Sequence, residues 1–232
     1  MIHQGEQNLV KLEWRRLRQT AIALAIGYSG LILVAVLITQ FADAFVAAKI
    51  VFPSLAGLLM GAGMVADDTQ QRTLSNIFSL PISRARLWVI RVGARMIVLF
   101  AFFIFWVLLP KIFGLDLTPP QSGSIPSNLF LIITGLLSFS MALLTTNLTN
   151  NSFEAALSSW ILIPLIMIIV RTNQQSDYSL SLYFVALVIT TGAAFHIFVT
   201  KEPPAGRALW KQTFLWMISL MAVLYLGAGL MG

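Results

Sequence analysis

Long apolar runs alternate with short polar stretches along almost the whole chain. A helix that crosses a bilayer core of about 30 Å needs about 20 predominantly apolar residues. Windows of this kind lie near residues 20–40, 45–66, 89–113, 129–147, 154–170, 180–199 and 213–231. The pattern therefore predicts a polytopic membrane protein with six to seven transmembrane helices. The fifth and sixth windows could also be one span plus a re-entrant element.

The apolar runs are continuous and rich in Leu, Ala and Ile. Strands of a transmembrane barrel instead alternate apolar and polar residues over segments of about ten residues. The fold class predicted for the chain is therefore all-α. Its transmembrane domain is expected to cover residues 20–232.

The segment before the first apolar run, residues 1–19, is polar and basic. On a helical wheel, the apolar and basic side chains of residues 8–19 gather on opposite arcs. The apolar arc holds Leu9, Val10, Trp14 and Leu17, and the basic arc holds Lys11, Arg15 and Arg18. This arrangement predicts a cytoplasmic tail followed by an amphipathic helix lying on the membrane surface. A simple basic topology anchor would show the same residues.

Composition and charge agree with a membrane location. Of 232 residues, 58% are hydrophobic and only 10% are charged, against about 25% charged in ordinary soluble domains. With the N-terminus inside, twelve Lys and Arg lie on or near the cytoplasmic face and three lie outside, as the positive-inside rule requires. This topology explains the net charge of +6 without a nucleic-acid partner, and the charge favours contact with anionic membrane lipid. We expect an integral protein of a prokaryotic inner membrane with a cytoplasmic N-terminus.

Motifs for catalysis or cofactor binding are missing from the sequence. The chain has no Cys and neither an H-E-x-x-H nor a G-x-S-x-G motif. It also lacks the G-x-x-x-x-G-K-[ST] loop that cradles ATP phosphates. We therefore predict no catalytic residue, no metal site and no cofactor bound by this chain.

The polar stretch between the second and third windows, residues 67–88, has the pattern of a small folded unit. A short helix is expected from about residue 70 to 79, capped by Asp67, Asp68 or Thr69. Leu74, Ile77 and Phe78 share one face of it, and Pro81 stops it. Ser83 then caps the next helix, with Ile82 and Leu87 spaced for a hydrophobic staple. The apolar face could rest on its own protein, on lipid, or in a groove of a partner.

The run Asp67-Asp68-x4-Thr73-Leu74-x5-Leu80-Pro81-Ile82-Ser83-Arg84-x2-Leu87-Trp88 resembles the cytoplasmic loop of permease subunits in the type-two family of ATP-binding-cassette exporters. Two features depart from that family. Arg72 stands where it usually has Gly, and a seventh apolar stretch exceeds its usual six.

The resemblance implies that residues 70–79 form a coupling helix that docks on a separate P-loop ATPase subunit. Two such ATPases, which bind ATP and Mg, and a second permease subunit, identical or related, would complete the transporter. The residues expected to couple to the ATPase are Arg72, Thr73, Leu74, Ile77, Phe78, Pro81, Ser83, Arg84 and Arg86.

Glu154 is the acid at the start of the fifth apolar window. Asn150, Asn151 or Ser152 can cap that helix, which places Glu154 in its first turn, where the helix dipole favours a carboxylate. Alternatively, Glu154 contacts the ATPase on the cytoplasmic face or lines an inward cavity. No substrate-binding residue can be named from the sequence.

The alternative function is an ATP-independent channel or secondary transporter. Such a protein would be expected to carry buried ionisable residues or interrupted repeats within its spans.

Overall fold

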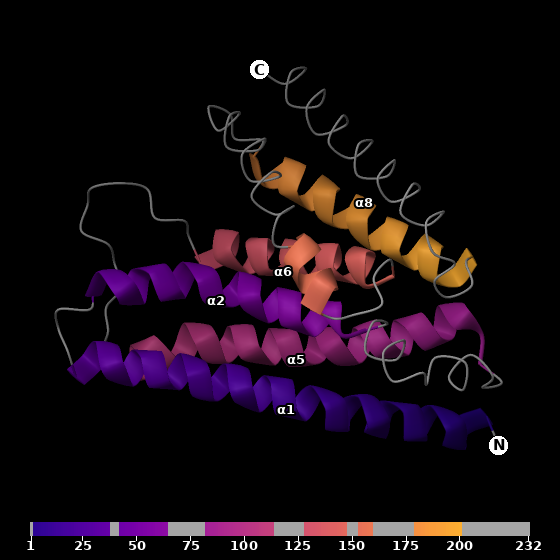
Figure 1. Ribbon diagram of the computed structural model, residues 1–232, viewed down its shortest axis with the longest axis horizontal. Helices are drawn as coiled ribbons and strands as arrows, with labels where there is room; N and C mark the ends of the chain where they lie inside the picture. The colour runs from indigo at the N-terminus through magenta and orange to yellow at the C-terminus, as the bar shows by residue number, and fades with distance from the viewer. Residues whose placement is uncertain are drawn as a thin grey trace.

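A computed structural model describes residues 2–37, 42–64, 82–113, 128–147, 153–159 and 179–200. Within these ranges the chain forms helices and no strand, which confirms the all-helical class for this part. The long helices are α1 (Ile2–Leu37), α2 (Ala42–Ala62), α5 (Arg84–Ile112), α6 (Asn128–Thr146) and α8 (Ser179–Thr200). They pack side by side as an elongated bundle (Figure 1).

The long helices coincide with five of the predicted apolar windows. Of the window 154–170, residues up to 159 are described and are helical, and the window 213–231 lies outside the described residues. By length and composition, Arg84–Ile112 in α5 and Tyr183–Thr200 in α8 could each cross a membrane. The count of six to seven spans remains a prediction.

The first helix differs from the sequence prediction. Residues 2–37 form one helix of 36 residues, so the expected boundary between a surface helix and a first span is absent. Of the expected apolar arc, Leu9 and Leu17 are buried within the protein, whereas Val10 and Trp14 are 46% and 57% exposed. The buried residues of α1 recur at intervals of four or seven residues and form a single stripe. This stripe holds Leu9, Glu13, Leu17, Leu24, Tyr28 and Ile32.

Helices α1 and α5 run parallel to each other in a constant register. Glu13 on α1 accepts a hydrogen bond from Arg91 on α5, and the hydroxyl of Tyr28 donates to the carbonyl of Trp106 at 3.2 Å. Both pairs are separated by 78 residues in sequence. Two polar contacts, 15 residues apart along each helix or about 22 Å, therefore fix this interface.

Helix α2 packs most extensively against α6, and glycines permit the close approach. A Cβ atom added at Gly61 would lie 2.6 Å from the carbonyl oxygen of Phe139, and one added at Gly57 would overlap the carbonyl oxygen of Gly135. At Gly135 an added Cβ would lie 2.8 Å from the carbonyl oxygen of Pro53. Gly57 and Gly61 stand in G-x-x-x-G spacing, which permits close helix packing.

One end of the bundle gathers the N-terminal part of α1, the end of α2, the start of α5 and the ends of α6 and α8 (Figure 1). The hydroxyl of Thr146 donates to the carbonyl of Ala62 at 2.6 Å, which ties the last turn of α6 to that of α2. We call this the loop end, because the stretch between α2 and α5 leaves from it and returns to it.

We predict that Gly57→Ala destabilises the fold by roughly 1–3 kcal/mol, because the added methyl group meets backbone rather than a side chain that can move. The exposed Gly30 is the matched control, since no atom lies within 4 Å of a Cβ added there. Gly30→Ala should change stability by no more than about 1 kcal/mol. Thermal unfolding in a mild detergent measures both, and equal effects would contradict the close α2–α6 contact.

Candidate functional site: a buried charge cluster at the loop end

Most of the residues expected to couple to an ATPase cannot be placed. Arg72, Thr73, Leu74, Ile77, Phe78 and Pro81, and with them the coupling helix near 70–79, lie outside the described residues. Ser83, Arg84 and Arg86 are described and begin α5. Of the 67–88 loop, the structure therefore describes only residues 82–88.

Ser83 caps α5, as predicted. Its backbone is extended, and its hydroxyl accepts a hydrogen bond from the backbone N–H of Arg86 at 3.4 Å. Ile82 and Leu87 both pack into the main hydrophobic core, as a hydrophobic staple requires. Trp88 meets Phe195 of α8 edge to face at 5.1 Å between ring centroids. The chain therefore enters α5 in a fixed direction.

Glu13 forms the centre of a charge cluster that the sequence reading did not identify. Its carboxylate is buried, with only 1% of the residue exposed. Arg91 Nε lies 2.6 Å from Glu13 Oε1, and Arg95 Nη2 lies 3.3 Å from Glu13 Oε2. Both arginines are buried on the inner face of α5. One carboxylate thus bridges two guanidinium groups across the α1–α5 interface.

Arg95 extends the cluster to a third helix. It donates from Nη1 to the carbonyl of Met60 at 2.6 Å and from Nη2 to the carbonyl of Gly63 at 3.2 Å. These carbonyls belong to the last turn of α2 and the residue just past it, where backbone acceptors have no intrahelical donor. A cation is also favourable at the negative end of the helix dipole. Glu13, Arg91 and Arg95 therefore join α1, α2 and α5 at the loop end.

The burial of this cluster makes each member costly to remove. Transfer of charges from water costs several kcal/mol per ion, and mutual attraction offsets this only when the partners are present in good geometry. Losing one partner leaves a buried charge without its counter-ion, which typically costs 3–5 kcal/mol. The cluster therefore holds α1, α2 and α5 together only while all three charged side chains are present.

A sequence signal for this cluster existed. Glu13 stands four residues from Leu9 and from Leu17, and Arg91 and Arg95 stand at the same spacing after Leu87 on an apolar helix. From the sequence alone, the arginines fit the positive-inside rule as topology charges on the cytoplasmic side, and Glu13 has no predicted role. This spacing alone could have placed Glu13 and the two arginines on the buried faces of their helices, but only the structure shows that these two faces meet.

Glu154 lies at the same end of the bundle. It is exposed within the helical segment 153–159. Residues 150–152, which were expected to cap this helix, lie outside the described residues, so the first-turn position of Glu154 stays a prediction. The hydroxyl of Thr145 donates to the carbonyl of Ala155 at 3.0 Å, so the segment is held against the end of α6.

Within the described ranges, no three His, Cys, Asp or Glu residues are grouped so that they could hold a metal ion. No protein-family model, curated protein or solved structure matches the chain.

We predict that Glu13→Ala lowers the unfolding free energy by about 3–5 kcal/mol, because Arg91 and Arg95 lose their shared counter-ion. For a chain of this size that corresponds to a fall in Tm on the order of 10 °C. Glu154→Ala removes an exposed carboxylate and should stay within about 0.5 kcal/mol of the parent. Unchanged thermal unfolding of Glu13→Ala in mild detergent would show that the cluster does not hold the helices together.

Proposed function

We propose that the protein is the membrane-spanning permease subunit of an ATP-binding-cassette transporter, an exporter, and that its 67–88 loop couples it to a separate P-loop ATPase. The residues expected to dock are Leu74, Ile77 and Phe78, with Arg72, Arg84 and Arg86 making polar contacts. The proposal rests on the resemblance of the loop and on how its two ends are held.

The observation that carries the proposal is the junction at the loop end. Arg95 binds the end of α2, Ser83 caps the start of α5, and Glu13 ties both to α1. A coupling element must pass force into the spans rather than bend at its base. A loop whose two ends are joined by buried charge-assisted hydrogen bonds has the required rigid base.

The first turn of α5 gives separate support. It holds Arg84 and Arg86 and no acidic residue. The positive end of a helix dipole disfavours cations there. Under the proposal, Arg84 and Arg86 contact lipid headgroups or an acidic partner surface at the membrane face, in addition to their contacts within the protein.

The outer face of α5 supports a membrane location. Apolar side chains at intervals of three, four and eight residues remain 45–67% exposed along its length, while the opposite stripe is buried. A helix that is apolar on both faces is typical of a span surrounded by lipid or by another apolar surface. The exposed stripe consists of Val89, Ile97, Phe100, Ile104 and Leu108.

The charge cluster also favours a second candidate, an ATP-independent channel or secondary transporter. Buried ionisable residues often mark ion or proton pathways in such proteins. Here, however, Arg95 donates to helix-terminal carbonyls and Glu13 receives both guanidinium groups. These bonds give the cluster a structural explanation, so the ABC permease remains the first proposal.

We predict that a P-loop ATPase co-purifies with the tagged chain from its native membrane and is lost from a Leu74→Asp, Phe78→Asp double variant. Emptying an anchoring pocket of Phe78 alone costs about 2 kcal/mol or more, which weakens binding about 30-fold. Mass spectrometry of the bound proteins measures the outcome.

The control is Asn76→Asp, Ser79→Asp, which adds the same charge to the opposite face of the expected helix and should retain the ATPase. Loss of the ATPase from both variants would implicate charge rather than the apolar face. A parent that purifies complete and stable without any ATPase would favour the channel or secondary transporter.

A further inference from the structure

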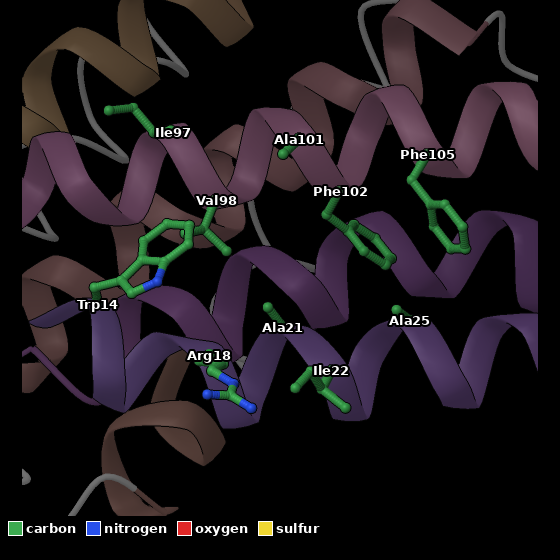
Figure 2. Close-up of a pocket in the computed structure, with 10 residues that line it drawn as sticks. All are labelled: Trp14, Arg18, Ala21, Ile22, Ala25, Ile97, Val98, Ala101, Phe102 and Phe105. Carbon is green, nitrogen blue, oxygen red and sulfur yellow. The ribbon is translucent and has the colours of Figure 1, made fainter.

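A pocket of about 350 Å³ lies between α1 and α5, beside the charge cluster. Its walls are apolar except at one end, where Trp14 and Arg18 stand (Figure 2). Ala21 and Ala25 line it from α1, and Phe102 and Phe105 line it from α5. We call this the Trp14–Arg18 groove.

The groove follows from the packing of the two helices. The Glu13–Arg91 bond pins α1 to α5 on one side of it, and the Tyr28–Trp106 bond pins them on the other. Between these points α1 presents the short side chains of Ala21 and Ala25. The helices cannot close this space without breaking one of the polar contacts, so the groove is a fixed part of the interface.

The groove is polar at one end only. Trp14 is 57% exposed and Arg18 is exposed beside it, whereas Ala25 and Phe105 at the other end are apolar. Lys11 is exposed two turns before Arg18 on the same face of α1. The acid of this region, Glu13, is turned inward and bound to Arg91 and Arg95, so its charge does not oppose an anion at the surface. An elongated ligand with one anionic end fits this distribution.

We propose that the Trp14–Arg18 groove binds one anionic phospholipid, with an acyl chain along Ala21, Ala25, Phe102 and Phe105 and the phosphate group beside Arg18. The indole of Trp14 then lies at the level of the headgroups, where Trp is enriched. Basic residues near a membrane surface each attract anionic lipid by about 1 kcal/mol. The inference requires that the chain lies in a membrane, but not that it couples to an ATPase.

Native mass spectrometry of the full chain in mild detergent tests the proposal, with phosphatidylglycerol and phosphatidylcholine titrated separately. We expect one phosphatidylglycerol to bind more tightly than phosphatidylcholine. Arg18→Gln should weaken phosphatidylglycerol binding about five-fold and weaken phosphatidylcholine binding less, because the choline ammonium already offsets the charge of its phosphate. Ala25→Phe should fill the groove and remove tight binding of both lipids.

Arg15→Gln is the matched control, because Arg15 is exposed on the same stretch of α1 but does not line the groove. It should change binding less than two-fold. Equal weakening by Arg15→Gln and Arg18→Gln would overturn the proposal in favour of diffuse surface attraction. Retention of the lipid by a folded Ala25→Phe protein would also overturn it, and so would a chain dimer that this substitution dissociates, since the groove would then hold a second copy.

Discussion

A carboxylate held between two guanidinium groups determines where three helices meet. Glu13 supplies the acceptor from α1, Arg91 and Arg95 supply the donors from α5, and Arg95 reaches the free carbonyls at the end of α2. Each of these side chains is buried, and the loss of one partner from a buried ion pair destabilises a protein far more than the same loss at the surface. Because Glu13 must face both arginines, the cluster fixes the rotation of α1 and α5 about their axes. The Tyr28–Trp106 bond then fixes the register of the two helices.

The other half of the bundle is held by a different kind of contact. Helices α2 and α6 approach so closely at Gly57, Gly61 and Gly135 that no side chain fits between them. Packing of this kind needs no buried charge and depends on the absence of a Cβ atom. The two halves are joined by Arg95 at the end of α2 and by the Thr146 hydroxyl on the carbonyl of Ala62. Helix α2 therefore belongs to both halves and ends at the loop.

The elements that the sequence predicted are those that local chemistry specifies. Apolar runs long enough to cross a bilayer coincide with the long helices, and Ser83 marks the start of α5. The charge cluster could not be predicted in the same way, because Glu13 is about 80 residues from Arg91 and Arg95 in the sequence. Without the pairing, the two arginines are explained equally well as cytoplasmic topology charges. Residues 8–19 are helical, as expected, within the longer helix α1, and their position on the membrane surface stays a prediction. The helical wheel separates an apolar arc from a basic arc but does not show that Glu13 faces the bundle, because that position depends on Arg91 and Arg95.

These restraints bear on how movement could pass through the protein under the proposed function. Helices α1 and α5 are pinned at two points, α2 is bound to α5 through Arg95, and α6 cannot separate from α2 without opening a glycine-lined contact. Displacement of the loop end would therefore carry α1, α2, α5 and α6 together, because each is tied to the next by a contact that is costly to break. Changes between inward-facing and outward-facing states would then arise by rocking of this body against a second permease subunit, as in the rigid-body class of conformational transitions. A lipid seated in the Trp14–Arg18 groove would move with the same body, since both walls of the groove belong to it.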